Sequence, residues 1–374
     1  MTHNSTPHLR RLALTLTCAF LLLSGLTGAM TKAYAQTRAY VANNSDHSVS
    51  VIDTATNSVV TTIPIDGFPL EVSITPDGTR AYVTNSAVSD TGSISVIDTA
   101  SNTVIATISS VSFPFLVAFT PDGARAYVTG LGNSVFVIDT GTNAVIATIP
   151  LLFPRGVAVT PDGTRVYIAH DVLNIVSVID TATNTVIATI PVGEGAFRLA
   201  LTPDGTRVYV TNREGSVSVI DTATNTVIAT IATAASGISV SDQEVAFTPD
   251  GTRAYVSDQL VDKVFVIDTA TNTVIATIPM GTLALPIGVA VTNDGSRVYV
   301  VNQGFGTVSV IDATTNTIIA TTPVGSNPFG IAITPPAALK TKDDCKNGGY
   351  KNFGPPVGPF KNQGQCIKFV LNAP

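Results

Sequence analysis

The sequence predicts a seven-bladed β-propeller, and three observations support this fold. One unit recurs seven times, each unit holds four short segments of alternating apolar residues, and the last such segment has no neighbour to pair with in sequence. A tyrosine opens every copy, 40 to 46 residues after the one before it: Tyr40, Tyr82, Tyr127, Tyr167, Tyr209, Tyr255 and Tyr299. A period of this length is typical of repeat architectures.

The four segments of each copy are predicted to be β-strands. In the fifth copy they cover residues 207–212, 217–221, 226–231 and 245–248, with β-branched residues at alternate positions. A period of two indicates strands, whereas helical repeats show a period of 3.6. Four strands in about 43 residues is the spacing of a propeller blade.

The turns between the segments have their own chemistry. Five copies follow the fourth segment with Thr-Pro-Asp-Gly, as at Thr75 to Gly78, and Asn293-Asp294-Gly295 is a variant. Proline presets φ and glycine accepts positive φ, which predicts a tight hairpin with a bulge. A second turn, such as Asp180 to Asn184, offers side-chain hydrogen bonds to its own backbone.

The fourth segment is predicted to lie nearest the propeller axis. The residue three positions before its turn is always small: Ser73, Ala118, Ala158, Ala200, Ala246, Ala290 and Ala332. Small side chains suit the most crowded strand. The first copy begins directly at Arg38, and residues 330–334 stand alone at the far end. We therefore expect this last segment to complete the first blade and close the ring.

The two ends of the chain indicate export. Arg10 and Arg11 precede an apolar run to about Leu26, and Ala33-Tyr34-Ala35 has the A-x-A form of a cleavage site. Residues 1–35 are therefore predicted to be a signal peptide, with Cys18 removed in it. The propeller is assigned to residues 36–336 and a separate tail to residues 337–374. The predicted location is secreted, periplasmic or at the cell surface, with no transmembrane segment after cleavage.

The charge of the chain argues against two classes of partner. Its formal net charge is −6, and loss of three cations with the signal peptide makes it about −9. An acidic surface disfavours nucleic acid and anionic lipid. Charged residues make up only 12% of the chain, about half the usual share of about 25%, in keeping with a strand-rich composition.

The repeats resemble the YVTN family of β-propeller repeats. The resemblance rests on Tyr-Val-Thr-Asn at Tyr82 to Asn85 and Tyr209 to Asn212, together with Ser-Val-Ile-Asp-Thr and Thr-Pro-Asp-Gly-Thr. It covers Arg38 to Thr334, and Gly130, His170 and Asp258 depart from it where Asn ends the motif. The family is associated with surface-layer and exported proteins. This implies binding, adhesion or scaffolding, and supplies no catalytic residues or cofactor.

The tail, rich in Lys, Gly, Asn and Pro, resembles a short two-cysteine module found at the ends of secreted bacterial proteins. After signal cleavage Cys345 and Cys366 are the remaining cysteines, and in an exported protein we expect them to form a disulfide. A loop of about 20 residues would gain roughly 3 kcal/mol in the chain-entropy model.

Two sets of residues, the repeated aspartates and the two histidines, could suggest a metal site. The aspartates that end the second segment of each copy are Asp53, Asp98, Asp139, Asp180, Asp221, Asp268 and Asp312. Turn capping explains an aspartate in every blade, whereas a cation site needs only one constellation, so turn capping is favoured. His47 and His170, the histidines of the mature chain, are interpreted as surface residues, and no metal site is predicted.

The candidate ligand site lies where the copies differ. Loops after the tyrosine segment and loops entering the fourth segment vary freely, and such loops often form the binding face of a repeat protein. Five positions before the turn residue, three copies carry a charge: Glu71, Arg198 and Glu244. Arg155 and Gln243 precede this position in two copies. Asp242, Glu194, Arg213 and Glu214 lie in the same class of loops.

These residues support two functional hypotheses. The first is an exported, non-catalytic binding or scaffold protein of the cell envelope or extracellular space that presents its variable loops to a protein, glycan or small ligand. The second is a lactonase-like hydrolase that uses Glu71, Arg198 and Glu244 at the mouth of the channel. Fold alone does not decide between them, because propellers host unrelated functions. Solvated loop charges are the plain structural alternative to both.

Overall fold

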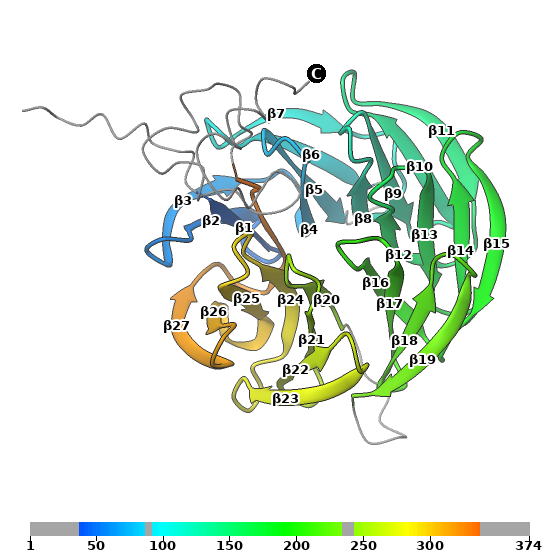
Figure 1. Cartoon of the computed structure of the whole chain (residues 1–374). Helices are drawn as coiled ribbons and strands as arrows, with labels where there is room; N and C mark the ends of the chain where they lie inside the picture. The colour runs from blue at the N-terminus through cyan, green and yellow to red at the C-terminus, as the bar shows by residue number, and fades with distance from the viewer. Residues whose placement is uncertain (1–36, 87–91, 234–242, 337–374) are drawn as a thin grey trace, which may run out of the picture. The chain divides into compact units, whose positions relative to one another are not determined.

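The computed structural model describes residues 37–86, 92–233 and 243–336. They form seven four-stranded antiparallel sheets arranged as blades around a ring, which confirms the predicted seven-bladed β-propeller (Figure 1). The predicted signal peptide, Asp242 and the tail with Cys345 and Cys366 lie outside the described residues. Within the described ranges no helix is long and apolar enough to cross a membrane.

Each blade has an inner, a second, a third and an outer strand. The inner strands of blades 1 to 7 are β28 (Pro328–Ile333), β4 (Phe68–Ile74), β8 (Pro114–Phe119), β12 (Pro154–Val159), β16 (Ala196–Leu201), β20 (Val245–Phe247) and β24 (Pro286–Val291). The second strands, in the same order, are β1 (Arg38–Asn43), β5 (Arg80–Ser86), β9 (Arg125–Gly130), β13 (Arg165–His170), β17 (Arg207–Asn212), β21 (Arg253–Asp258) and β25 (Arg297–Asn302).

The third strands are β2 (Ser48–Asp53), β6 (Ser93–Asp98), β10 (Ser134–Asp139), β14 (Ile175–Asp180), β18 (Ser216–Asp221), β22 (Lys263–Asp268) and β26 (Thr307–Asp312). The outer strands are β3 (Ser58–Pro64), β7 (Thr103–Ile108), β11 (Ala144–Pro150), β15 (Thr185–Pro191), β19 (Thr226–Ala232), β23 (Thr273–Pro279) and β27 (Thr317–Pro323). A short 3-10 helix, η1 (Gln303–Phe305), follows β25.

The ring closes as the sequence predicts. Strand β28 pairs with β1 in antiparallel register, with Ala39 opposite Ile333 and Tyr40 opposite Ala332. The backbone N–H of Arg38 also donates to the Thr334 hydroxyl at 2.9 Å. The C-terminal strand is therefore the inner strand of blade 1.

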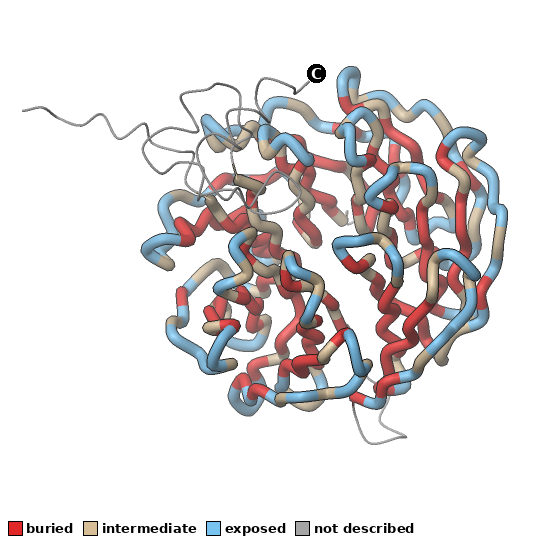
Figure 2. The backbone as a smooth tube through the Cα atoms, viewed as in Figure 1, coloured by how far each residue is buried: buried red, intermediate tan, exposed pale blue. Residues whose placement is uncertain are grey.

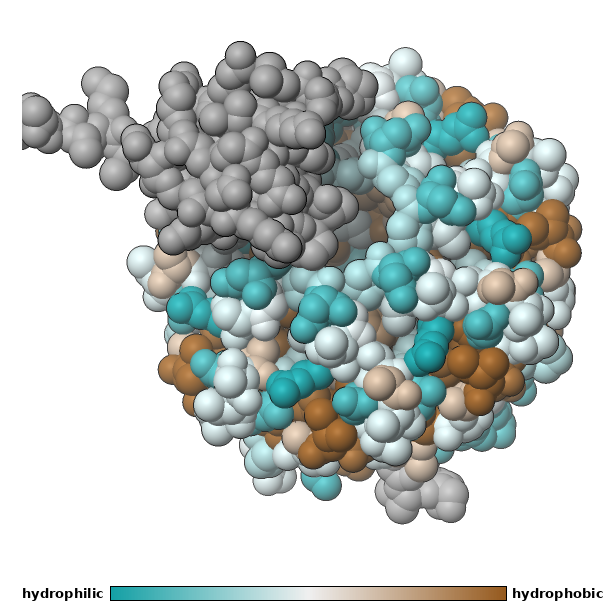
Figure 3. Space-filling view, in the orientation of Figure 1, coloured by the Kyte–Doolittle hydropathy of each residue, from teal (hydrophilic) through white to brown (hydrophobic). Residues whose placement is uncertain are grey.

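Burial is greatest in the second and third strands, and the outer strands are exposed (Figure 2). Apolar clusters lie between neighbouring blades; one joins Tyr40 and Val51 of blade 1 to Val72 and Ile97 of blade 2. The outer strands keep apolar residues such as Val60, Ile105 and Ile187 half exposed, and hydrophobic areas appear around the periphery in Figure 3. The core is thus a series of interfaces between blades.

A cycle of hydrogen bonds joins all seven blades. In each blade the buried tyrosine of the second strand donates its hydroxyl to an asparagine in the third-to-outer turn of the next blade. The pairs, at 2.5 to 3.1 Å, are Tyr40–Asn102, Tyr82–Asn143, Tyr127–Asn184, Tyr167–Asn225, Tyr209–Asn272, Tyr255–Asn316 and Tyr299–Asn57. Each asparagine has positive φ, so it both shapes its own turn and receives the neighbouring blade.

The two predicted turns have the expected geometry and share one rim, which we call the turn rim. In the Pro-Asp-Gly turn of blade 5, Gly205 has φ of 71° and its N–H donates to the Thr202 carbonyl at 2.8 Å. In the third-to-outer turns the aspartate caps the backbone, as Asp180 does for Thr183. This hydrogen bond is the main reason why the pKa of Asp180 is lowered. The structural interpretation of the turn aspartates is confirmed.

The departures from Asn at the end of the second strand are accommodated locally. In four blades this Asn donates to two hydroxyls of the third strand, as Asn212 does to Ser216 and Ser218, each at 2.9 Å. In blade 3 a phenylalanine replaces the second hydroxyl, and a Cβ on Gly130 would lie 2.7 Å from the Phe136 ring. Residue 130 therefore has to be small.

Candidate functional site

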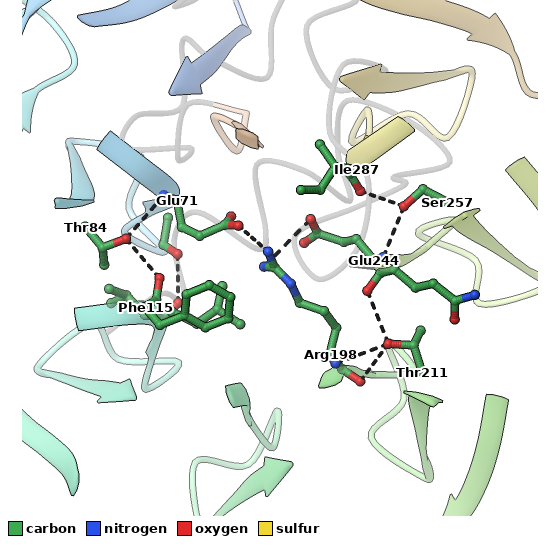
Figure 4. Close-up of polar contacts among 12 residues, drawn as sticks. Glu71, Thr84, Phe115, Arg198, Thr211, Glu244, Ser257 and Ile287 are labelled. Carbon is green, nitrogen blue, oxygen red and sulfur yellow. Dashed lines mark hydrogen bonds and ion pairs between the residues drawn. The ribbon is translucent and has the colours of Figure 1, made fainter. Parts of the chain in front are cut away.

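The loops on the opposite rim, between second and third strands and before the inner strands, are called the variable rim. Near this rim, Arg198 of β16 in blade 5 forms an ion pair with Glu71 of β4 in blade 2. The NH1 atom of Arg198 lies 3.9 Å from Oε2 of Glu244, next to β20 of blade 6. Figure 4 shows the guanidinium between the two carboxylates. The structure therefore brings together all three charged positions predicted from the repeat comparison.

Two of these residues are not the solvated charges that the sequence suggested. Glu71 is 3% exposed and Arg198 is 2% exposed, so the alternative of solvated loop charges is wrong for them. The reason is that Arg198 reaches a partner three blades away in sequence order, and each side chain shields the other from water. A buried pair of this kind is strongly destabilising to break, because the remaining charge is left buried without compensation.

A hydroxyl on the second strand holds each of these axial positions. The Thr84 hydroxyl accepts the N–H of Glu71 at 3.2 Å and donates to the Phe115 carbonyl of the next blade at 2.9 Å (Figure 4). Thr211 does the same for Arg198, and Ser257 for Glu244. Thr129 repeats the arrangement at Leu116. Each hydroxyl thus links an inner strand to the inner strand of the next blade.

The other three blades use glycine at the axial position. A Cβ on Gly156 would lie 2.9 Å from the Leu199 backbone nitrogen, one on Gly288 would lie 2.5 Å from the Phe329 carbonyl oxygen, and one on Gly330 would lie 2.8 Å from the Glu71 Cα. The residue thirteen positions on, or its equivalent in blade 1, is then apolar: Ala169, Val301 and Ala42. In these blades the next inner strand packs directly on the glycine. The axial position therefore carries a side chain in blades 2, 3, 5 and 6.

Three arginines surround two buried phenyl rings beside this bridge. The Cζ atoms of Arg155 and Arg198 lie 5.0 to 5.6 Å from the ring centroids of Phe115 and Phe197, and the Cζ of Arg213 lies 4.4 Å from that of Phe197. The two rings meet edge to face at 5.8 Å. Stacking of a guanidinium on an aromatic face is favourable and fixes the plane of its N–H groups.

Asp171, on the loop after β13, joins two of these arginines. Its Oδ2 atom lies 3.4 Å from Nε of Arg155 and 3.2 Å from NH1 of Arg213. The side chain of Asp171 is 9% exposed, whereas those of Arg155 and Arg213 are 27% and 35% exposed. Two guanidinium groups from blades 4 and 5 therefore converge on one carboxylate oxygen and remain accessible from the variable rim. We call Arg155, Arg213 and Asp171 the arginine pair and its carboxylate.

Gln243, the remaining predicted site residue, has a different role. It is buried, and its Nε2 donates to Oδ2 of Asp258 at 3.1 Å. Asp258 also accepts the N–H of Leu260 at 3.1 Å. Burial raises the pKa of Asp258. Gln243 thus contributes to the structure of the loop in blade 6.

The histidines differ from each other. His47 is exposed, as predicted, and its ring packs on Phe68 with a centroid distance of 4.3 Å. His170 is 1% exposed, so its interpretation as a surface residue is wrong. Its ring nitrogens contact the Leu152 carbonyl at 2.6 Å and the Ser177 hydroxyl at 2.9 Å. The histidine thus takes the place of the asparagine that ends this strand in other blades. Burial lowers the pKa of His170, which favours the neutral ring.

The structure also describes a pocket of about 470 Å³ on the turn rim, lined by residues that include Pro161, Asp162, Asp204 and Gly205. These belong to the turn motif that recurs from blade to blade. The Asp204 carboxylate already accepts hydrogen bonds from Thr202 and Thr206. The pocket therefore has no feature that distinguishes it from the repeated turn architecture.

Comparison with known proteins supports the fold. A sequence profile of the cytochrome D1 heme domain matches residues 26–163, less than half of the chain, and no curated protein matches it. A hydrazine synthase structure from Kuenenia stuttgartiensis has a TM-score of 0.63 and 22% identity, over 70% of this chain and 88% of that chain. A functionally unknown protein from Desulfotomaculum acetoxidans DSM 771 has a TM-score of 0.68 and 19% identity, over 80% and 99%.

A third similar structure is dihydro-heme d1 dehydrogenase NirN in complex with DHE, with a TM-score of 0.58 and 16% identity, over 79% of this chain and 74% of that chain. Similarity at this level of identity establishes a shared propeller fold. It does not establish a shared activity, because propellers host unrelated functions. The site must therefore be judged on its own residues.

The heme named in two of these comparisons can be tested against the donors present. Heme iron is commonly held by histidine, methionine, cysteine or tyrosine. Among the described residues, both ring nitrogens of His170 are engaged, and the seven buried tyrosines donate to asparagines. His47 lies in blade 1 and Met280 is packed in the apolar cluster between blades 6 and 7, whereas the arginines and phenyl rings lie in blades 3 to 5. The described residues do not fit an axial ligand for heme iron at this site.

Proposed function

We propose that the protein is an exported binding protein that holds a small carboxylate ligand at the variable rim. The observation that carries the proposal is the convergence of Arg155 and Arg213 on the carboxylate of Asp171, with both guanidinium groups accessible. A planar guanidinium has five N–H donors and matches the geometry of a carboxylate. The Asp171 carboxylate marks where a second carboxylate can be received.

The surroundings of the pair favour a selective site. Phe197 lies beneath Arg213 at 4.4 Å and beneath Arg155 at 5.6 Å, so the two side chains are supported on a buried ring. Preorganised donors lose less conformational entropy on binding than donors on free chains. The overall negative charge of the chain makes this local group of cations a distinct feature of the surface.

Export and a binding or scaffold role also follow from the predicted leader sequence and the resemblance to YVTN repeats, which remain predictions. The predicted hydrolase would need Glu71 or Glu244 to reach a substrate. The Glu71 side chain is 4% exposed and paired with Arg198, although that of Glu244 is 22% exposed. The geometry therefore favours binding at the arginine pair over acid–base chemistry in the channel.

The proposal is tested by measuring thermal stabilisation and calorimetric binding of the mature protein with a panel of small mono- and dicarboxylates at neutral pH and low salt. We expect at least one to bind, and we expect Arg155→Ala and Arg213→Ala each to weaken it about tenfold. The matched control is Lys263→Ala, an exposed cation on blade 6. Lactone hydrolysis is assayed in the same samples. Turnover that is lost in Glu244→Gln and kept in Arg213→Ala would contradict the proposal.

A further inference from the structure

Five exposed apolar side chains lie on neighbouring loops of the variable rim. They lie on the loops of blades 3 and 4 and are Leu131, Leu152, Phe153, Val172 and Leu173, with 38% to 61% of their surface exposed. We call these five residues the apolar patch. The half-exposed Val and Ile of the outer strands recur in the blades. On the variable rim, exposed apolar side chains also occur at Leu260, Leu283 and Phe305 of blades 6 and 7, but the apolar patch is the group that adjoins Arg155 and Asp171 in the sequence.

The loops that carry the apolar patch are fixed by hydrogen bonds to one another. The N–H of Phe153 donates to Oδ1 of Asn133 at 2.9 Å, and the N–H of Leu151 donates to the Asn133 carbonyl at 3.1 Å. The N–H of Asp171 donates to the Phe153 carbonyl at 3.3 Å. Three loops therefore form one connected surface.

This surface continues directly into the arginine pair. Leu152 and Phe153 precede Arg155 by three and two residues, and Val172 and Leu173 follow Asp171 at once. Because Asp171 bonds both to the Phe153 backbone and to the two arginines, the apolar and cationic parts share one anchor. A ligand that places a carboxylate at the arginines must extend its next groups over the patch or away from it.

We propose that the ligand is the C-terminal end of a peptide whose last two residues are apolar. Its α-carboxylate would bind Arg155 and Arg213, and its two side chains would cover the apolar patch. This rests on the proposed function and names its ligand class. The patch contains two separate apolar pairs, Leu152 with Phe153 and Val172 with Leu173. Two apolar side chains of a peptide match these two pairs better than the single unbranched chain of a fatty acid does.

The neighbouring acids define the orientation. Glu194 and Glu214 lie on the loops of blade 5 beside Arg213, where the N–H of Glu214 donates to the Glu194 carbonyl at 3.4 Å. They disfavour a second negative charge on that side. The peptide is therefore expected to leave the site over blades 3 and 4, with no acidic residue next to its terminus.

The test uses fluorescence anisotropy of labelled peptides with the mature protein. The probes share a Gly/Ser linker and end in two leucines with a free carboxylate, in two leucines with an amide, or in two serines with a free carboxylate; decanoate is a competitor. We expect the dileucine acid to bind best, with at least tenfold weaker binding of the amide and of the diserine acid. Leu152→Ser with Val172→Ser should also weaken the dileucine acid about tenfold, while Ile105→Ser on β7 should not.

Each other outcome overturns a defined part of the proposal. Equal binding of the dileucine and diserine acids, with loss of the amide, overturns the apolar terminus and leaves carboxylate binding in place. Decanoate that displaces the peptide with higher affinity than the dileucine acid assigns the patch to an acyl chain. Failure of all peptides to bind folded protein overturns the inference, and the carboxylate panel then decides the proposed function separately.

Discussion

The two rims of this propeller are built from the same strands and differ in what their loops do. On the turn rim, nearly identical Asp-containing turns satisfy their own backbone and receive a tyrosine from the neighbouring blade. On the variable rim, blades differ in sequence, and charged side chains from different blades meet, as Glu71 and Arg198 do. The turn rim therefore repeats a folding solution, while the variable rim combines non-equivalent blades into one surface.

The largest effect should come from removing the strand that closes the ring and so supports both rims. Truncation before Asn327 deletes β28 and leaves β1 with an unpaired edge. We expect the cooperative thermal transition of the whole propeller to be lost. Truncation after Pro336 is the control and should melt like the mature chain. A truncated protein that melts normally would show that β28 is dispensable.

A change at the buried bridge should come next, and it shows that the variable rim also contributes to folding. Arg198→Ala leaves the Glu71 carboxylate buried, and we expect a loss of about 3–5 kcal/mol in the free energy of unfolding. Arg213→Ala on the same rim is 35% exposed and should cost less than about 1 kcal/mol. Urea unfolding measures both. Replacing Glu71 and Arg198 together by Leu and Met should restore much of the loss.

On the turn rim, Gly205→Val should cost about 2–4 kcal/mol, because a β-branched side chain would have positive φ and crowd its neighbour. A Cβ at this position would lie 2.7 Å from Cδ of Pro161. Gly141→Val, in a turn of the same rim, meets nothing closer than 3.4 Å and serves as the control. Similar denaturant midpoints for the two variants would refute the steric argument.

The two rims should also lose stability in different pH ranges. Burial lowers the pKa of His170, so the unfolded state, with a pKa of about 6.5, binds the proton first. Stability from the neutral ring is present above that value and declines as the pH falls below it. His170→Asn, which restores the common motif, should flatten the unfolding free energy between about pH 7 and pH 5. An unchanged slope would exclude this residue as its cause.

The smallest effect is expected at an exposed turn aspartate. The backbone of Thr183 lowers the pKa of Asp180, so its contribution is present above the unfolded pKa of about 3.9 and is lost at lower pH. Asp180→Asn keeps an acceptor oxygen, so it should leave neutral stability nearly unchanged. The midpoint of acid unfolding should move slightly lower, and a shift to higher pH would contradict this.

The sequence predicted the elements that depend on local chemistry. Blade number, ring closure and the turns all follow from periodicity and from residues such as Gly205 and Asp180. The burial of Glu71 and Arg198 could not be predicted, because their contact joins non-adjacent blades and residues 127 positions apart. Asp171, Phe115 and Phe197 were missed because each also depends on a partner from another blade: Asp171 on Arg213 of blade 5, and the two phenyl rings on each other and on Arg155 of blade 4.

One signal in the sequence could have located the axial positions. Blades with a side chain there carry Thr or Ser thirteen residues later, as in Glu71 with Thr84, and blades with glycine carry Ala or Val, as in Gly156 with Ala169. Where the axial residue has a side chain, a hydroxyl on the second strand bridges the two inner strands by hydrogen bonds. Where the axial residue is glycine, the next inner strand packs directly on it, and an apolar residue suffices on the second strand. Such paired differences between copies indicate contact within one chain.

The cycle of tyrosine–asparagine bonds has a consequence for the connectivity of the chain. The bond from Tyr299 to Asn57, which joins the last blade to the first, is of the same kind as the six bonds between successive blades. Every blade is therefore both a donor to one neighbour and an acceptor from the other, and the bonds run around the ring in a single rotational sense. The interface between blades 7 and 1 therefore has the same hydrogen bond as the other six interfaces. Circular permutation could move the termini to another turn without removing any of the seven bonds.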